Sequence, residues 1–266
     1  MGYTMRLTVF RSLTFMSLLW ALMLPGEALA DCHPDTHLVI YEGVVGKYPV
    51  RVALMYRADG IIDGRYAYAT STEDIRLSGR LGANGKHLEL TELGTKAQPT
   101  ANFRGVFLDH DASFANGTQL NCEVIEGNWQ STSTGQALPF KLHMDTVLPS
   151  SVSDFDHLYA VAGVENDETV NRAAARFRHA VVGNERSVVA SMIRYPVTVT
   201  INKRRVTLKS TDALLARYDQ VFTPKFRKII ADAVPRFMFA RYDGIMLGET
   251  GEVWLSGNGM VIGLNN

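Results

Sequence analysis

Apolar and polar positions alternate with a period of two over most of residues 38–144. The clearest run has Arg51 and Arg57 on one side and five apolar side chains on the other: Tyr48, Val50, Val52, Leu54 and Tyr56. Since successive side chains of a strand point to opposite faces, this spacing predicts strands that each bury one face.

Short turn signals separate these alternating segments. Three Asx-Gly pairs stand between them: Asp59-Gly60, Asn84-Gly85 and Asn116-Gly117. Such pairs accept the positive φ angles that tight hairpins require. We therefore predict seven or eight antiparallel strands in a meander, which form either a small barrel or a sandwich.

Beyond residue 153 the period changes to that of helices. One apolar stripe is Val170, Ala174, Phe177 and Val181, and the next runs from Val188 to Ile193. A hairpin is expected over 197–208, and a helix over 211–222. Thr223-Pro224 is typical of an N-cap followed by proline at the first helical position. Four strands are then expected between residues 236 and 264.

The stretch 147–153 shows neither period and contains Pro149 together with three serines. It is the best linker candidate in the chain. The predicted organisation is an antiparallel β domain over 31–147, a linker over 148–160 and a second domain over 161–266.

The first 30 residues have the pattern of a signal peptide. Arg6 and Arg11 precede an apolar run of 12 residues, Leu13–Leu24, and Ala28-Leu29-Ala30 gives a small-x-small cleavage pattern. A membrane-spanning helix needs roughly 20 apolar residues, so cleavage after Ala30 is expected rather than anchoring. The mature protein would then be periplasmic or secreted, without a membrane span.

The chain has two cysteines, Cys32 and Cys122. In an oxidising compartment, a pair of this kind predicts one disulfide. A catalytic cysteine would instead need a free thiolate and a positioned base.

Charge and motifs exclude several function classes. Lys plus Arg and Asp plus Glu number 27 each, so no strongly basic surface for nucleic acid is expected. The sequence lacks a P-loop, a G-x-G-x-x-G turn, a G-x-S-x-G elbow and an H-E-x-x-H helix. No cofactor is therefore expected.

Three segments carry a family resemblance: Tyr195-Pro196-Val197, residues 218–224 (YDQVFTP) and residues 244–248 (GIMLG), which precede Val253-Trp254-Leu255. With the element order over 165–264, they resemble exported bacterial proteins of the nuclear transport factor two-like superfamily, which includes ketosteroid isomerase-like enzymes and non-catalytic binding modules. The resemblance implies a cone of curved sheet wrapped by helices. The expected fold class is thus α+β, with an antiparallel barrel or sandwich followed by a cone-shaped α+β domain.

In such a cone, the mouth could hold Tyr218, Asp219, Tyr242 and Asp243 as proton donor and general base. Both aspartates also fit a purely structural role. Asp243 precedes Gly244 in a turn that favours aspartate, and Asp219 is about 100° around a helix from Tyr218. Tyr242 and Trp254 are also candidates for contact with a protein partner.

The expected new N-terminus offers a metal hypothesis. A free amine on Asp31, two amide nitrogens and the imidazole of His33 can form a square-planar site for Cu(II) or Ni(II). The alternative is chance, because any histidine in third place creates this pattern. A resident metal is not expected.

Together these features favour an exported binding or protein-interaction protein without a catalytic set. The partner would be another protein or a small ligand in the cone cavity. One alternative is a cofactor-independent isomerase or hydrolase-like enzyme that uses this cavity. Another is a periplasmic immunity protein that neutralises a delivered toxin.

Overall fold

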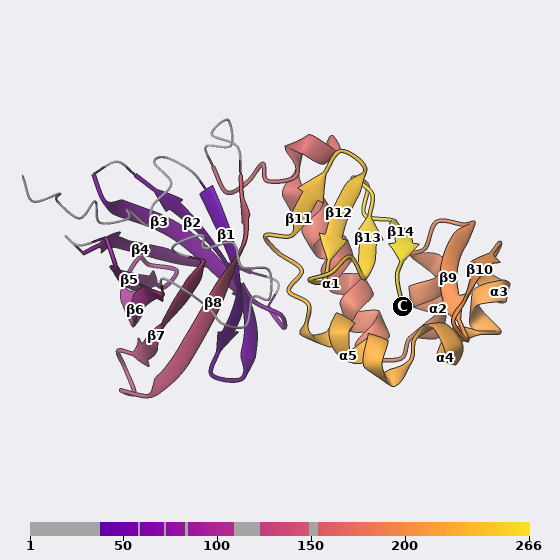
Figure 1. Cartoon of the computed structure of the whole chain (residues 1–266), viewed down its shortest axis with the longest axis horizontal. Coiled ribbons are helices and arrows are strands. Elements are labelled where there is room, and N and C mark those ends of the chain that lie inside the picture. Colours follow the sequence, from indigo (N-terminus) through magenta and orange to yellow (C-terminus); the bar gives the residue numbers. More distant parts are fainter. Residues whose placement is uncertain (1–37, 58, 72, 83–84, 109–122, 149–153) are drawn as a thin grey trace, which may run out of the picture.

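The computed structural model describes residues 38–57, 59–71, 73–82, 85–108, 123–148 and 154–266. Within these residues, a β-barrel lies beside a second region that contains the helices and two small sheets (Figure 1). No helix in the described ranges is both long and apolar enough to cross a membrane.

The barrel consists of eight strands: β1 (Leu38–Val45), β2 (Tyr48–Tyr56), β3 (Ile61–Tyr68), β4 (Ile75–Leu81), β5 (His87–Leu93), β6 (Pro99–Leu108), β7 (Val124–Ser131) and β8 (Ala137–Val147). Each strand pairs antiparallel with the next, and β8 pairs back with β1 to close the sheet. Closure leaves no unpaired edge. The β-barrel that the alternating pattern allows is therefore confirmed.

Side chains fill the middle of the barrel. In β2 the inward positions are the apolar ones that the alternation identifies, and all but the exposed Tyr48 are buried there. Edge-to-face contacts join Tyr66 to Phe103 and Phe103 to Phe140, with ring centroids 5.4 and 5.3 Å apart. Gly105 leaves room for this cluster, because a Cβ there would lie 2.8 Å from the Phe140 ring.

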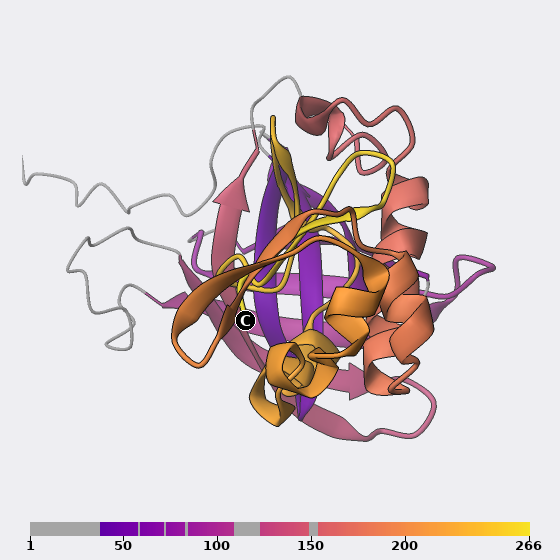
Figure 2. The ribbon, with the colours of Figure 1, turned by 90° about the vertical axis from the view of Figure 1, so that its right-hand side faces the viewer.

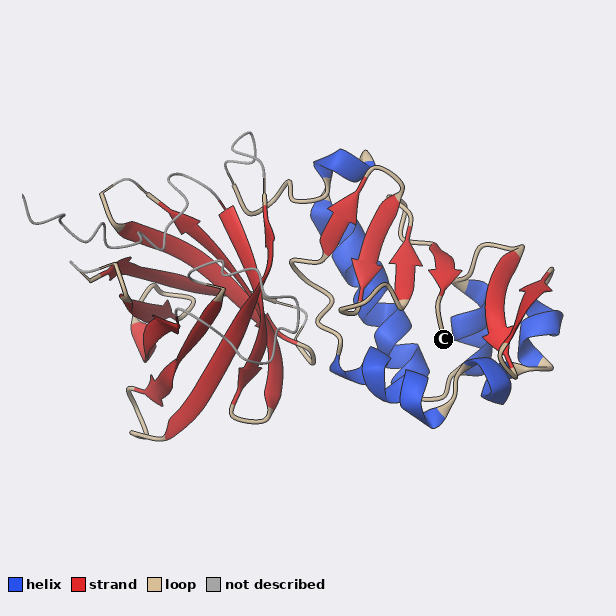
Figure 3. Ribbon diagram, viewed as in Figure 1, coloured by secondary structure: helices blue, strands red, loops and turns tan. Residues whose placement is uncertain are grey.

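The second region contains the short helix η1 (Ala160–Ala162) and five α-helices, α1 (Asp167–Val182), α2 (Arg186–Ser191), α3 (Thr211–Leu215), α4 (Tyr218–Val221) and α5 (Pro224–Asp232). Asn166 caps α1 through the Glu168 amide, and Thr223 caps α5 through the Phe226 amide. The N-cap predicted at Thr223-Pro224 is thus present. The helices of this region and the strands of both regions are distinguished in Figure 3.

The strands of the second region form two separate sheets. One is the hairpin β9 (Val197–Ile201) and β10 (Arg204–Leu208), and the other contains β11 (Phe239–Arg241), β12 (Gly244–Leu247), β13 (Val253–Leu255) and β14 (Val261–Leu264). Between β9 and the end of β14, the side chain of Asn266 exchanges hydrogen bonds with the Thr200 backbone at 2.8 Å. This side-chain contact connects the two sheets, which share no backbone ladder between the described strands β9 and β14.

The fold class expected from the sequence is therefore wrong. The described chain is mostly β, with few helices, and it is built on an eight-stranded closed barrel. The predicted cone needs one curved sheet, whereas β9 and β10 pair only with each other among the described strands. A period of two indicates strands, but it does not specify which hairpins join into one sheet.

One hydrophobic core spans the junction of the two regions. The outer face of β1, β2 and β3 contributes small or aliphatic side chains to the core that surrounds α1: Leu38, Ile40, Ala53 and Ala67, with Ala69 just beyond the end of β3. Phe155, Leu158 and Tyr159 also pack into this core, although they belong to the predicted linker. The view turned by 90° looks along the long axis of the molecule, with the second region in front of the barrel (Figure 2).

Candidate binding site at the barrel rim

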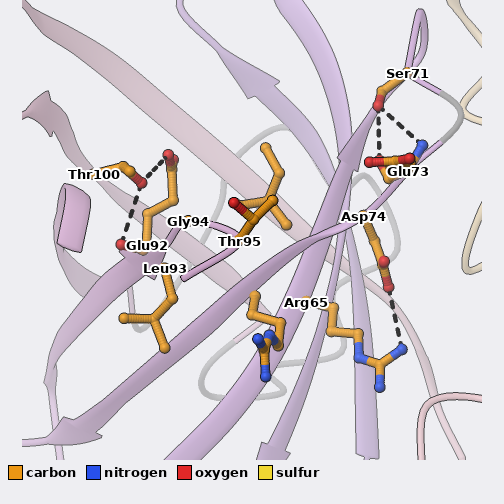
Figure 4. A pocket seen from close by; sticks show the side chains of 11 residues that line it. Arg65, Ser71, Glu73, Asp74, Glu92, Leu93, Gly94, Thr95 and Thr100 are labelled. Atoms are coloured by element: carbon orange, nitrogen blue, oxygen red, sulfur yellow. Dashed lines mark hydrogen bonds and ion pairs between the residues drawn. The ribbon is translucent and has the colours of Figure 1, made fainter. Parts of the chain in front are cut away.

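A cavity of about 680 Å³ opens at one rim of the barrel. Ser71, the segment from Glu73 to Arg76 and the segment from Glu92 to Thr95 supply most of its walls, on the β3–β4 and β5–β6 sides (Figure 4). The lining residues are Arg65, Ser71, Glu73, Asp74, Ile75, Arg76, Glu92, Leu93, Gly94, Thr95 and Thr100. Pockets of roughly 300 to 1,000 Å³ hold small ligands, and the mouths of β-barrels are common places for them.

Glu92 borders this cavity from inside the barrel, with 9 % of the residue exposed. Thr100 Oγ1 donates to Glu92 Oε1 at 2.6 Å, and Trp129 Nε1 donates to Oε2 at 3.0 Å. The Tyr66 hydroxyl donates to the same Oε2. Burial, assisted by Tyr68 and Glu92, raises the pKa of Tyr66 far above its usual value, so this hydroxyl remains a donor. Three donors therefore hold the Glu92 carboxylate in place.

Two arginines lie side by side on the outer face of the same rim. Arg65 on β3 and Arg76 on β4 are directly opposite each other in the strand register. Arg65 Nη1 is 2.8 Å from Asp156 Oδ1 and 3.4 Å from Asp74 Oδ2. Like charges in opposite positions repel each other, so these two aspartates offset the charge of Arg65.

A second cavity, of about 80 Å³, continues from Arg65 and Asp74 into the junction with the second region. Asp167, only 5 % exposed, accepts hydrogen bonds there from the amides of Leu158 and Tyr159 at 2.6 and 3.2 Å. Burial nevertheless raises the pKa of Asp167 to about 6. This cavity is large enough to hold water.

Arg51 links the barrel to the second region at another point of the junction. It is 4 % exposed, and its Nε donates to the Phe237 carbonyl at 2.9 Å. Its Nη1 is 2.9 Å from Glu42 Oε2, and its Nη2 pairs with Asp145. Burial raises the pKa of Glu42 and the charge of Arg51 lowers it. The effect of burial is larger, so the pKa is raised to about 7.

The four residues predicted to share a cone mouth lie on two elements, with Tyr218 and Asp219 on α4 and the other two between β11 and β12. Tyr218 is 1 % exposed, stacks on Phe222, and its hydroxyl has no hydrogen-bond partner among the described residues. Asp219 faces solvent, where it accepts from Arg186 Nη1 and Nη2 at 3.0 and 2.8 Å. Neither residue lines the rim cavity or the junction cavity.

Tyr242 and Asp243 form the turn between β11 and β12. Tyr242 is 84 % exposed, and Asp243 pairs with Arg241. The guanidinium of Arg241 lies 4.3 Å from the ring centroid of Trp254, which is half-buried on the adjacent sheet face. Tyr242 is thus accessible at the turn, whereas Trp254 is partly covered by Arg241.

Four predicted residues fall outside the part of the chain that the structure describes. These are the cysteine pair Cys32 and Cys122 and the candidate metal ligands Asp31 and His33. Across the ranges that are described, no group of three or more histidine, cysteine, aspartate or glutamate side chains is arranged to hold a metal ion.

Comparison with protein families, characterised proteins and solved structures finds no match for this chain. The resemblance to the nuclear transport factor two-like superfamily therefore stays a prediction.

Sequence reasoning missed the rim residues Glu92, Arg65 and Arg76, although a signal for the first was present. Glu92 follows Leu88 and Leu90 at a spacing of two, so it shares their inward face. A carboxylate on an apolar strand face needs partners, and it therefore indicates a polar site. The opposition of Arg65 and Arg76 could be found only after the strand register was known.

Proposed function

We propose that this protein is an exported binding protein that holds a small polar ligand in the rim cavity of its barrel. The observation that carries this proposal is a cavity of about 680 Å³ in which five of the eleven lining residues are charged. Ligand sites use a few placed polar groups to fix orientation. The signal-peptide pattern of residues 1–30 supports export, and the test of that part is N-terminal sequencing of the exported protein, expected to begin at Asp31.

Binding is favoured over catalysis because the hydroxyl of Ser71 and the carboxylate of Glu92 already form hydrogen bonds within the protein. A serine nucleophile needs a base within hydrogen-bond reach. Ser71 Oγ instead donates to the backbone carbonyl of Glu73 at 2.7 Å. Glu92 accepts from three donors, so its oxygens are committed to holding the rim. These contacts position groups without activating a nucleophile.

A protein partner is the second candidate, and Tyr242 favours it. An aromatic side chain that is 84 % exposed at a hairpin tip, beside an arginine, has the composition of an interface anchor. An immunity protein that neutralises a toxin would use such a surface. Tyr242→Ala should then weaken capture of the partner and leave the melting temperature unchanged, because the side chain has few contacts to lose.

The main test is a binding screen by protein-observed NMR. The probes are single amino acids, dipeptides, monosaccharides, nucleosides, dicarboxylic acids and polyamines, each added separately to the uniformly ¹⁵N-labelled mature protein. Amide shift changes are expected to concentrate at residues 65, 71, 73–76 and 92–95. Changes confined to other parts of the molecule, or no changes with any probe, would reject the proposal.

A blocked variant is the matched control for this screen. Thr95 lines the cavity from a loop, so Thr95→Trp should fill the space and remove the shift changes. Thr134→Trp places the same bulk on another exposed loop, between β7 and β8, outside the cavity lining. The Thr134 variant should bind as the unmodified protein does.

A further inference from the structure

Among the described residues, the rim cavity contains one positive side chain that the protein itself does not neutralise. Arg65 is held by Asp156 and Asp74, but the opposite residue, Arg76, is exposed and forms no ion pair with any residue that the structure describes. The guanidinium of Arg76 is therefore available to an anionic group, and such a group would also reduce its repulsion with Arg65. Arginine binds carboxylates through two parallel hydrogen bonds.

Among the described residues, the same cavity also contains one negative side chain that the protein itself does not neutralise. Of its three carboxylates, Glu92 has three donors, and Asp74 faces Arg65. Glu73 is exposed, and its contacts with Ser71 use only its backbone N–H and carbonyl. Within the described residues, its carboxylate has no ion-pair partner.

From these two groups we propose that the rim cavity binds small zwitterions, either an amino acid or a short peptide. The carboxylate of the ligand would bind Arg76, and its ammonium group would bind Glu73. This inference rests on the proposed function, and it adds the ligand class. The ligand class follows from charge. Glu73 would repel a purely acidic ligand, and Arg76 would repel a purely basic one.

The remaining lining includes both apolar and polar side chains. Ile75 and Leu93 supply apolar side chains to the lining. Thr95 adds a hydroxyl on the β5–β6 loop (Figure 4). The cavity volume of about 680 Å³ is larger than a single small amino acid requires, so a dipeptide is the better first probe. Its two charged ends are also farther apart than those of an amino acid.

Three matched probes test the inference by isothermal titration calorimetry: glycylglycine, N-acetylglycine and glycinamide. Glycylglycine carries both charges, and each of the other two carries one. We expect glycylglycine to bind about two- to fivefold more tightly than either, because each of those two probes loses one ion pair with an exposed side chain. Arg76→Gln and Glu73→Gln should each remove this advantage.

Arg80→Gln is the matched control. Arg80 is exposed on the same strand and the same face as Arg76 but does not line the cavity, so its variant should bind glycylglycine with unchanged affinity. Circular dichroism melting should show all three variants folded, since each altered side chain is exposed.

The outcomes separate the ligand class from the function. If N-acetylglycine binds as tightly as glycylglycine, or if Arg76→Gln leaves the affinity unchanged, the zwitterion inference is wrong. If none of the three binds while a monosaccharide shifts the amides of the cavity, the inference is wrong and the binding function stands. If no probe class shifts those amides, both proposals fail.

Discussion

The barrel and the second region bury their apolar residues in different ways. In the barrel, every strand pairs with its sequence neighbour, and the core lies inside the closed sheet. In the second region, two small sheets and five α-helices share a core that also needs the outer face of β1, β2 and β3. The barrel thus encloses its own core, whereas the second region uses the barrel surface as one wall.

The buried polar clusters also differ in whether they use one region or both. The buried polar cluster of the barrel, around Glu92, uses barrel residues alone: Tyr66, Thr100 and Trp129. The cluster around Arg51 joins both regions, because the Phe237 carbonyl comes from the second region. A substitution in the Glu92 cluster should therefore destabilise the barrel alone, and a substitution in the Arg51 cluster should destabilise both regions. The following predictions test that contrast.

The largest effect is expected for Arg51→Met. The substitution leaves the carboxylates of Glu42 and Asp145 and the Phe237 carbonyl without their shared donor. Removing one partner of a buried ion pair costs about 3 to 5 kcal/mol. Urea unfolding, followed by fluorescence, should show this loss in the free energy of unfolding.

Arg57→Met is the control, because Arg57 is exposed at the end of the same strand and pairs with exposed Asp63. Its cost should stay below about 1 kcal/mol. Adding Glu42→Gln to Arg51→Met should restore part of the lost stability. Equal costs for the two arginine variants would show that the junction does not depend on Arg51.

A smaller loss is expected for Glu92→Leu. The Tyr66 hydroxyl and the Trp129 indole would lose their acceptor inside the barrel end. An unsatisfied buried donor costs about 1 to 3 kcal/mol, so the free energy of unfolding should fall by about 2 to 3 kcal/mol. Glu89→Leu, on the exposed face of the same strand, should change it by less than about 0.5 kcal/mol.

The pH dependence of stability should arise at the junction. The pKa of Glu42 is raised from 4.5 to about 7 by burial and by the carboxylates of Asp145, Glu249 and Glu252, against the effect of Arg51. A raised pKa means that the folded state holds the proton more tightly, so the contribution of Glu42 to stability is greatest below pH 4.5 and declines as the pH rises to about 7.

Asp167, with a pKa raised to about 6, adds a decline of the same sign at lower pH. Urea midpoints measured from pH 5 to 8 should therefore fall for the unmodified protein and fall less for Glu42→Gln. Identical pH profiles for the two proteins would contradict the raised pKa of Glu42.

The two regions also differ in how much could be predicted from the sequence. Barrel pairing is local: the Asp59-Gly60 turn joins β2 to β3, and the alternation specifies which face is buried. The sheets of the second region depend on long-range packing, such as the contact of Asn266 with Thr200. No period in the sequence specifies such a contact. The arginine pair of the rim site was missed for the same reason, since Arg65 and Arg76 become neighbours only through the strand register.

The smallest effect is expected for Asp219→Asn, at an ion pair that belongs to the second region alone. Asp219 is exposed, and its partners Arg186 and Arg227 are also accessible to water. Exposed pairs contribute about 0.2 to 1 kcal/mol, so a double-mutant cycle with Arg186→Gln should give a coupling energy in that range. The same cycle between Arg51→Met and Asp145→Asn should give a coupling several times larger, because that pair is buried at the junction. Equal coupling energies would mean that position in the fold does not decide what these ion pairs contribute, and the contrast between the two regions would not hold for charges.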